Sequence, residues 1–531
     1  MATIKNILIV GGGSSGWMTA AYLAHRLKNI NITLIESKKI GTIGVGESTL
    51  GHINRFLDAL GLKDEDWMAE CDATYKTSIK FTDFRKPGTY FHYPFGQYNV
   101  YDTRNGIYDW FWYQAHTGKQ YPATDFAEMY VNSVMMTDRN KMTKNADQGI
   151  PGFSFHNDTA YHMDADKFGK MLKRKFADPN GVVHIQDTVV DVRQNEDGSV
   201  KEIITEDGRV LTADLFIDCT GFAKILIEKV MGSKFINFNE TLLNDRALAA
   251  RIPYINPEEE MHSVTNCTAI ESGWVWDIPL FSRRGTGYVH SSQFADREQA
   301  EKDFRKHLAL RIGEAKAEET EFNYIKIRHG MQETPWVKNV CAIGLSLGFI
   351  EPLESTGLLT THENIIRLAN MLERRDGYVN KFDIDGWCFA AKEELEGFRQ
   401  FVSLHYAMSE REDTPYWRHV TGNVDYLGKD LTELRPVIRT NVQGLVYNMH
   451  ITNRVLEQTS GETFIFAGMG YNPKTKALVD MELTAWDFEA DKAWINTRQQ
   501  YELRKANILA HIDTLPTHYQ FLKDNIYNVT K

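Results

Sequence analysis

Six residues near the N-terminus have the spacing of a dinucleotide-binding turn. They fit the pattern G-x-G-x-x-G and are Gly11, Gly12, Gly13, Ser14, Ser15 and Gly16. The first glycine of this pattern permits a tight turn, the second lets the backbone approach a pyrophosphate, and the third lets a helix pack closely on a strand. The positive end of the following helix then favours a phosphate. The alternative is a purely structural glycine turn.

A strand, a helix and a second strand must hold this turn in place. Residues 4–10 form a short apolar run typical of a buried parallel strand, and residues 17–27 have helical spacing without a breaker. Residues 32–36 form a second strand that ends at Glu36, 20 residues after Gly16. An acid at this position accepts hydrogen bonds from a ribose. The unit therefore predicts dinucleotide binding, without separating FAD from NAD.

Three further segments favour FAD. Residues 43–48 (IGVGES) form a glycine-rich strap with room for a flat cofactor, and residues 214–221 (DLFIDCTG) form a buried strand that ends in small residues. Residues 342–346 (AIGLS) form another strand that ends at glycine, and no second complete G-x-G-x-x-G motif appears. These segments resemble glutathione-reductase-type FAD folds. The further predicted cofactor-binding residues are Glu36, Ser37, Ile40, Ile43, Val45, Ser48, Val189, Leu345 and Leu358.

The pattern along the chain predicts an α/β fold with a helical attachment. Strands alternate with turns between about residues 180 and 220, and long helical patterns follow residue 360. We predict an FAD-binding core at 1–82 and 160–360, and a mainly helical substrate-binding module at 83–159 and 361–531. No linker rich in Gly, Ser and Pro separates them, so the modules are expected to be intergrown.

Composition excludes several classes of protein. The formal charge of −11 argues against a nucleic-acid partner, because such binding needs basic residues to neutralise phosphates. The sequence contains no run of 18 apolar residues, so we expect no membrane span. The N-terminus leads into a strand and does not have the pattern of a secretory signal. Five scattered cysteines without a C-x-x-C pair fit free thiols in a reducing compartment. We expect a cytoplasmic protein without a metal site.

A second motif, Trp274-Val-Trp276-Asp-Ile-Pro, extends the argument to a family. Together with GGGSSGW it resembles the flavin-dependent halogenases of the tryptophan-halogenase type. The segments at 78–81 (SIKF), 349–357 (FIEPLESTG) and 411–417 (REDTPYW) resemble further family motifs in the same order. The resemblance runs from residue 5 to about 420 and returns weakly at 466–468 (FAG).

The resemblance implies a mechanism and assigns residues to it. FADH2 comes from a separate flavin reductase, and its reaction with O2 and chloride or bromide yields hypohalous acid, which travels through a tunnel inside the protein. Lys80 hydrogen-bonds this oxidant or forms a haloamine, and so directs the halogen onto a small, electron-rich aromatic substrate. Glu354 polarises the oxidant or takes the ring proton. The backbone amides of Thr356 and Gly357, near a helix start, suit the halide.

Each of these residues has a simpler reading. Trp274 and Trp276 would lie on one face of a strand, where aromatic pairs usually belong to the core. A lone Lys80 is usually solvated or snorkelled, and Glu354 could cap a helix. Under the halogenase reading, the substrate-contacting residues are Phe95, Trp274, Trp276 and Ser355.

The substrate segment departs from the family pattern. Before the FAG motif, tryptophan-using members carry a Tyr-Tyr pair, a Glu and a Phe-Trp pair that clamp the amino acid. This chain has Leu445-Val446, Thr452 and Leu456-Glu457 at those positions. We therefore expect an indole or phenol rather than free L-tryptophan. The aromatic residues at 108–113 could line a different pocket or belong to the core. A FAD-dependent aromatic hydroxylase, a non-catalytic flavoprotein and a homo-oligomer are left open.

Overall fold

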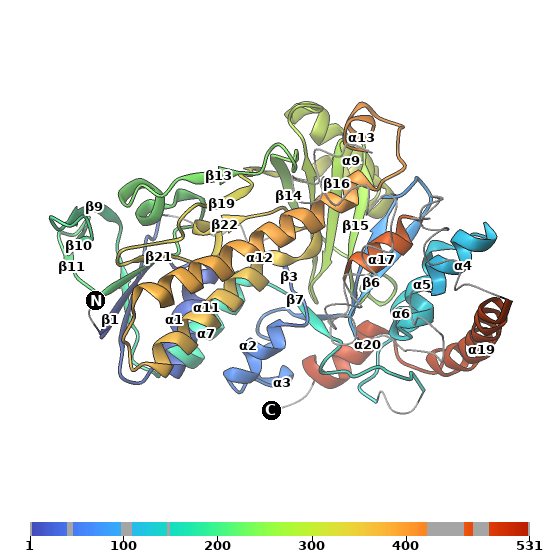
Figure 1. The fold of residues 1–531 in the computed structure, drawn as a ribbon, viewed down its shortest axis with the longest axis horizontal. Coiled ribbons are helices and arrows are strands. Elements are labelled where there is room, and N and C mark those ends of the chain that lie inside the picture. Colours follow the sequence, from blue (N-terminus) through green and yellow to red (C-terminus); the bar gives the residue numbers. More distant parts are fainter. Residues whose placement is uncertain are drawn as a thin grey trace. The chain divides into compact units, whose positions relative to one another are not determined.

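The computed structural model describes residues 3–39, 46–96, 109–145, 149–421, 461–470 and 488–528 (Figure 1). The chain divides into two compact units, each made of three segments. Unit 1 comprises Met1–Ala73, Tyr161–Asp245 and Lys326–Arg399, and unit 2 comprises Thr74–Ala160, Arg246–Ile325 and Gln400–Lys531. The predicted α/β fold of the glutathione-reductase type is confirmed, with a parallel sheet at the N-terminus.

A mainly parallel sheet is the centre of unit 1. Its described strands have the order β20-β21-β12-β1-β2-β8. They are β1 (Asn6–Val10), β2 (Asn31–Glu36), β8 (Val183–Gln186), β12 (Leu215–Asp218), β20 (Trp336–Val337) and β21 (Val340–Ala342). The last four residues of β1 are all buried, as expected for an apolar strand covered on both faces of a parallel sheet.

Three helices pack together beside this sheet. Helix α1 (Ser14–Arg26) contacts both α7 (Ala165–Leu172) and α11 (Thr356–Arg374), and Figure 1 shows the three side by side. The other elements of unit 1 are β3 (Glu47–Ser48), α2 (Ile53–Ala59), α3 (Asp64–Trp67), β7 (Ala160–Met163), η3 (Lys173–Ala177), β9 (Val189–Gln194), β10 (Val200–Thr205), β11 (Val210–Leu211), η4 (Gly221–Ala223), η5 (Ile225–Val230), β13 (Phe235–Asn237), β19 (Gly330–Gln332), η6 (Gly344–Ser346), β22 (Gly348–Phe349) and η7 (Pro352–Glu354).

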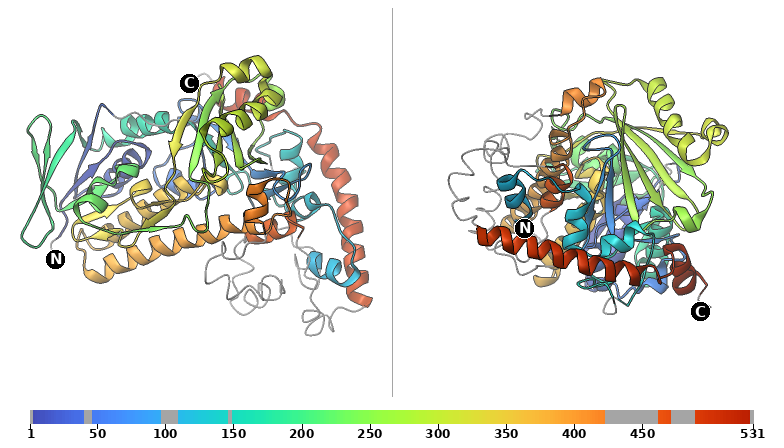
Figure 2. Two further views of the ribbon diagram at one scale, coloured as in Figure 1. Left: turned by 90° about the horizontal axis from the view of Figure 1, so that it is seen from above. Right: turned by 90° about the vertical axis from the view of Figure 1, so that its right-hand side faces the viewer.

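Unit 2 contains a seven-stranded sheet with the order β18-β14-β17-β16-β15-β5-β6. The strands are β5 (Ser78–Thr82), β6 (Tyr90–Pro94), β14 (Arg246–Ile252), β15 (Val264–Ile270), β16 (Gly273–Pro279), β17 (Arg284–His290) and β18 (Asn323–Lys326). Helix α9 (Arg297–Ile312) packs on β14 and β17, and Figure 2 shows it in yellow-green against the sheet. Leu248, Val275, Tyr288 and Phe304 are fully buried in the core between them.

Helices make up most of the rest of unit 2. These elements are β4 (Thr74–Lys76), α4 (Asp109–Thr117), α5 (Ala123–Tyr130), α6 (Ser133–Asp138), α8 (Pro257–Glu260), α10 (Glu314–Glu319), α13 (Pro415–Val420), α17 (Gly461–Gly468), α19 (Phe488–Ile512), α20 (His518–Leu522) and η10 (Lys523–Tyr527). The division between the units falls within α12 (Lys381–Ala407). None of the described helices is both long and apolar enough to cross a membrane.

The unit boundaries differ from the predicted domain boundaries in two places. Residues 246–325 fall in unit 2, because β15 pairs in parallel with β5 and so joins this region to the sheet that includes β6. Residues 361–399 fall in unit 1, because α11 packs on α1. That the cofactor binds one region and the substrate the other stays a prediction.

A buried carboxylate holds the end of β12. Asp218 accepts hydrogen bonds from the backbone N–H groups of Leu226 and Ile227 (both 2.8 Å) and from the Ser346 hydroxyl (3.0 Å). It also accepts from the N–H (2.9 Å) and hydroxyl (2.7 Å) of Thr220. These five bonds compensate the cost of removing the charge from water and tie β12 to η5 and η6.

We predict that Asp218→Ala lowers the free energy of unfolding by about 3 kcal/mol, because it leaves several buried donors without an acceptor. Asp191→Ala, at an exposed carboxylate on β9, is the control and should stay within about 0.5 kcal/mol of the wild type. Urea unfolding followed by circular dichroism measures both. Equal losses for the two variants would contradict a structural role for Asp218.

Candidate cofactor and catalytic sites

The glycine turn joins β1 to α1 as the sequence predicts. A side chain at Gly11, whose φ is +110°, would overlap the carbonyl oxygen of Cys219, and one at Gly16 would overlap the carbonyl of Gly11. Gly13 precedes α1 and has no atom within 4 Å of the position a Cβ would take. The first and third glycines are therefore required by the fold, whereas Gly13 opens onto free space. This open side lies at the start of α1, where the positive end of a helix suits a phosphate, and contact of Gly13 with the FAD pyrophosphate stays a prediction.

Three strand ends converge at this turn. Val10, Asp218 and Ala342 are neighbours in register on β1, β12 and β21. A Cβ at Gly344 would lie 2.7 Å from Ser15 Cβ, so the η6 turn, which contains Leu345, lies directly against the glycine turn. The structure thus brings together the glycine turn and two of the three segments that favour FAD, residues 214–221 and 342–346.

The predicted ribose-binding acid lies at the end of β2. One carboxylate oxygen of Glu36 is 2.8 Å from His184 Nε2, and the other lies against Gly12, where a side chain would overlap it. The Ser37 hydroxyl shares a 2.9 Å hydrogen bond with Thr188, the neighbour of Val189. Contact of these side chains with a cofactor stays a prediction. The predicted cofactor residues Ile40, Ile43 and Val45 lie outside the described residues.

The turn before α11 contains the predicted catalytic residue Glu354, and the start of α11 contains the predicted halide-binding residues Thr356 and Gly357. Glu354 is buried at the end of η7, and Ser355 has a left-handed backbone with φ of +58°. The Ser355 hydroxyl donates to Ser48 (3.0 Å) and does not cap α11. Thr356 begins α11 with a buried Leu358 in its first turn, and the space beside Gly357 is open within 4 Å. A helix start of this kind suits an anion.

Sequence reasoning missed two acids beside these segments. Burial raises the pKa of Glu47, the neighbour of Ser48, to about 7. Glu351 is fully buried and accepts a hydrogen bond from Asn244 Nδ2 (2.9 Å). His329 Nε2 lies 2.5 Å from the Asn244 carbonyl, so this ring nitrogen donates. The sequence offered one signal for Glu47, because it is the one charged residue of the 43–48 strap. The environment that raises its pKa could not be predicted from the sequence.

Lys80 lies in a charged network on β5. Its Nζ is 2.9 Å from Asp138 Oδ1 and 3.8 Å from the centre of the Tyr90 ring. His92 Nε2 lies 3.0 Å from the same carboxylate oxygen. Burial alone would raise the pKa of Asp138, but the neighbouring His92 and Lys80 hold it well below its usual range. The Lys80 side chain is 26% exposed, so it is partly solvated as well as paired.

A second lysine, which the sequence reasoning missed, is fully buried. Lys76 ends β4, has 0% exposure, and holds its Nζ 5.1 Å from the centre of the Phe95 ring. Phe95, the predicted aromatic wall, is itself buried. Lysines are almost never fully buried unless paired, and buried ionisable groups are concentrated at functional sites. The available signal was a second lysine four residues before Lys80 in the stretch TYKTSIK.

The two tryptophans of the second motif lie on β16. Their rings are 6.3 Å apart at 61°, and both are buried. Gly287 on β17 makes room for Trp276, because a side chain there would overlap the indole. Their place within the core of unit 2 accounts for the motif structurally, and contact with a substrate stays a prediction.

The REDTPYW segment anchors α13 beside this hairpin. Arg411 is buried, forms an ion pair with Asp413 (2.7 Å) and donates to the Ala269 carbonyl (2.9 Å). Trp417 Nε1 donates to the Ile270 carbonyl at 2.7 Å. The segment therefore attaches to the end of β15, next to the strand that carries the tryptophans.

The other aromatic segments divide between core and undescribed regions. Trp110, Phe111 and Tyr113 are buried in α4, where Trp110 packs against Tyr121 and Trp494, so they belong to the core. Tyr108, the first aromatic residue of 108–113, lies outside the described residues. The positions at which family members carry the substrate clamp also lie outside them; these are Leu445, Val446, Thr452, Leu456 and Glu457.

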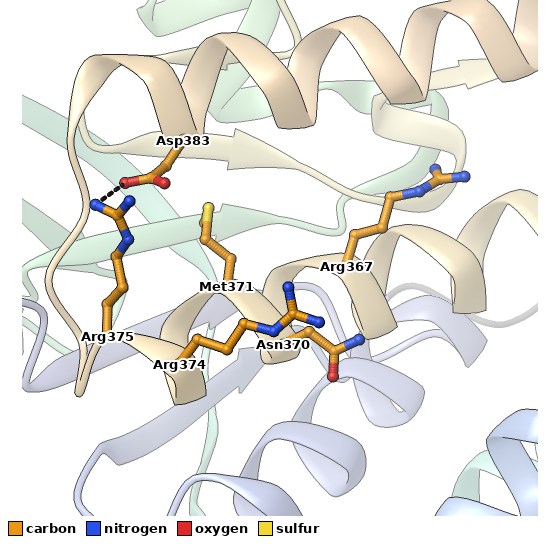
Figure 3. Close-up of a pocket in the computed structure, with 6 residues that line it drawn as sticks. All are labelled: Arg367, Asn370, Met371, Arg374, Arg375 and Asp383. Carbon is orange, nitrogen blue, oxygen red and sulfur yellow. Dashed lines mark ion pairs between the residues drawn. The ribbon is translucent and has the colours of Figure 1, made fainter.

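A cavity of about 430 Å³ lies in unit 1, away from the predicted residues. Figure 3 shows its lining on α11, α12 and the residues between them: Arg367, Asn370, Met371, Arg374, Arg375 and Asp383. Arg375 and Asp383 form an ion pair across it (3.2 Å). Among the described residues, no group of three or more His, Cys, Asp or Glu side chains is placed to hold a metal ion. The five cysteines are free, and four of them are buried.

Comparison with known proteins agrees with the geometry. The chain matches the family described as "Tryptophan halogenase" over residues 6–482. It is 34% identical to 7-chloro-L-tryptophan 6-halogenase KtzR of Kutzneria sp. (strain 744), over 97% of this chain and 98% of that protein. Solved structures include VirX1 in its apo form (42% identity, TM-score 0.89, 99% and 100% coverage). Another is Tar14, a tryptophan C-6 flavin-dependent halogenase from taromycin biosynthesis (32% identity, TM-score 0.82, 98% and 99% coverage).

We predict that Gly13→Val abolishes FAD binding without unfolding the chain. Its side chain would enter space that the protein leaves open, where a pyrophosphate must approach the backbone. Gly386→Val, at an equally open position on α12, is the matched control and should bind FAD as the wild type does. Titration of FAD by fluorescence quenching measures affinity, and thermal unfolding checks the fold. Wild-type affinity in Gly13→Val would place the cofactor elsewhere.

Proposed function

Because the chain belongs to the tryptophan halogenase family, whose members are flavin-dependent enzymes, we propose that it uses FADH2, O2 and halide to halogenate an electron-rich aromatic ring. The observation that carries the proposal is the convergence of three strand ends at an open Gly13, in a chain that matches this family over residues 6–482. A separate flavin reductase would supply the reduced cofactor.

FAD would be held mainly by unit 1. The start of α1 and the open Gly13 would receive the pyrophosphate, and Glu36 would accept hydrogen bonds from the ribose. Once bound, FAD would supply the redox chemistry that converts halide into hypohalous acid. The residues expected along the adenine and isoalloxazine are Ser37, Ile40, Ile43, Val45, Ser48, Val189, Leu345 and Leu358.

The start of α11 would bind the halide. The N–H groups of Thr356 and Gly357 lie at the positive end of a 19-residue helix. Ser355 directs its hydroxyl to Ser48 rather than to the helix, so its side chain does not compete for those groups. Glu354, buried next to this turn, would polarise the oxidant or take the proton that the ring releases.

A lysine would guide the halogen to the substrate. The motif resemblance points to Lys80, but its ammonium is engaged by Asp138 and Tyr90. The buried Lys76 against Phe95 favours Lys76 as the guiding residue instead. Its amine would hydrogen-bond hypohalous acid, or displace hydroxide from it to give a haloamine and water. The ring would then take the halogen and release a proton.

The substrate prediction rests on the sequence of residues 445–457. KtzR and Tar14 act, by their names, on a chlorinated tryptophan and on tryptophan. This chain lacks the Tyr-Tyr, Glu and Phe-Trp residues that resemble an amino-acid clamp, which supports an indole or phenol without the amino-acid head.

We predict higher kcat/KM for such indoles or phenols than for L-tryptophan. Each missing charge-assisted hydrogen bond costs about 1.5–3 kcal/mol, or roughly 10- to 150-fold. The assay combines the protein with a flavin reductase, NADH, FAD, O2 and bromide or chloride, and mass spectrometry identifies products. Efficient, single-position halogenation of L-tryptophan would refute the substrate class. Hydroxylated product formed without halide would refute halogenation and identify a hydroxylase.

We also predict that Lys76→Met yields almost no halogenated product while FAD binding and flavin oxidation continue, because the amine beside Phe95 that would guide the halogen is lost. Lys80→Met, at the partly exposed lysine of the same segment, should retain part of the product. Flavin oxidation by stopped-flow absorbance and product yield by mass spectrometry are measured together. The opposite ranking of the two variants would assign the role to Lys80.

A further inference from the structure

The backbone between the two lysines is held from three sides. Thr77 separates β4 from β5, and its N–H donates to the Ser263 carbonyl (2.8 Å). Its own carbonyl accepts from the N–H of Phe95 (2.9 Å), the residue whose ring lies against Lys76. Its hydroxyl shares a 2.7 Å hydrogen bond with Thr137 on α6. The place of the Lys76 amine therefore depends on contacts of its neighbour.

Asp138, the residue after Thr137, makes a second connection between α6 and the strands. Asp138, which ends α6, accepts from Lys80 on β5 (2.9 Å) and from His92 on β6 (3.0 Å). His92 is buried, and its Nδ1 is hydrogen-bonded to the Ser78 hydroxyl (2.8 Å). One carboxylate thus joins α6 to both strands of the hairpin that carries Lys80 and Phe95.

The charge of Asp138 is essential to this attachment. The surrounding groups are Lys80, His92 and Tyr90, whose hydroxyl lies 3.4 Å from Oδ2, with Asn266 opposite Lys80 on β15. The neighbouring His92 and Lys80 keep the pKa of Asp138 low, so the carboxylate is ionised. Burial and the charge of Asp138 raise the pKa of Tyr90 to about 12, so Tyr90 remains a neutral donor. Loss of the carboxylate charge would leave the Lys80 ammonium without its counter-charge.

We propose that Asp138, together with Thr137, is a positioning residue: it fixes residues 76–80 from α6 so that the guiding lysine keeps its place beside Phe95. This inference rests on the proposed halogenase function. Asp138 itself touches neither the oxidant nor the ring. Misplacement of a reacting group by about 1 Å can cost roughly 100-fold in rate, so a loss of this anchor should appear in the transfer of halogen and not in its generation.

The test compares Asp138→Asn, which keeps the shape and removes the charge, with Asp125→Asn. Asp125 on α5 pairs with Arg498 at 2.9 Å and is buried to a similar degree (17% against 18% for Asp138), but it is not bonded to residues 76–80. The readout is the ratio of halogenated product to flavin oxidised. We expect Asp138→Asn to lower this ratio by roughly 10- to 100-fold, with FAD affinity and flavin oxidation unchanged, and Asp125→Asn to keep the wild-type ratio.

Two further variants separate positioning from loss of fold. Asp138→Glu keeps the charge and should recover most of the ratio, which a general packing defect would not allow. Thr137→Val removes the bond to Thr77 together with a bond to the Ser133 carbonyl inside α6, leaves Asp138 unchanged, and should lower the ratio even if Asp138→Asn does not fold. A wild-type ratio in folded Asp138→Asn, or in Thr137→Val if the former is unfolded, would overturn the inference. Absence of halogenated product from the wild-type protein would instead refute the proposed function.

Discussion

The close approach of β1 and β12 is the constraint on which the cofactor region depends. At the end of these strands, Gly11 lies so near the Cys219 carbonyl that no side chain fits between them. This approach allows the chain to turn directly into α1 and leaves Gly13 on the open side. It also brings Asp218 within reach of η5 and η6, so the segment with Leu345 packs against Ser15. A single missing Cβ thus permits three distant segments to share one edge of the sheet.

Buried charge is handled in two different ways in this protein. Asp218 and Asp138 are surrounded by donors, which compensate the cost of removing a carboxylate from water. Lys76 is completely buried with its amine 5.1 Å from the centre of the Phe95 ring, whereas the Lys80 side chain is 26% exposed. The complete burial of Lys76 beside Phe95 is the physical basis for preferring it over Lys80.

The parts of the fold that depend on local spacing could be predicted from the sequence. The turn at residues 11–16, β1, α1 and β2 follow from glycine positions and apolar periodicity within 35 residues, and the α/β fold followed from them. The buried state of Lys76 could not be predicted, because its amine lies against Phe95 and its neighbour Thr77 is bonded to Ser263 and Thr137, all of them distant in the sequence. The unit boundary near residue 246 was missed for the same reason, since the parallel pairing of β15 with β5 joins strands almost 190 residues apart. Residues 445–457, on which the substrate prediction rests, lie outside the described part of the chain.

The interleaved arrangement of the units also constrains how this protein can fold as it is synthesised. Val10 can pair with Ile35 of β2 early, but its other neighbour, Asp218 on β12, comes some 200 residues later, and the strand beyond it ends at Ala342. The sheet of unit 1 therefore cannot be completed until some two thirds of the chain has left the ribosome, and unit 2 needs residues beyond 400. Contacts of such long sequence separation form slowly and leave apolar strands exposed in the meantime. Until β12 and β21 have been synthesised, the apolar side chains of β1 and β2 therefore lack the rest of the sheet that covers them in the folded protein.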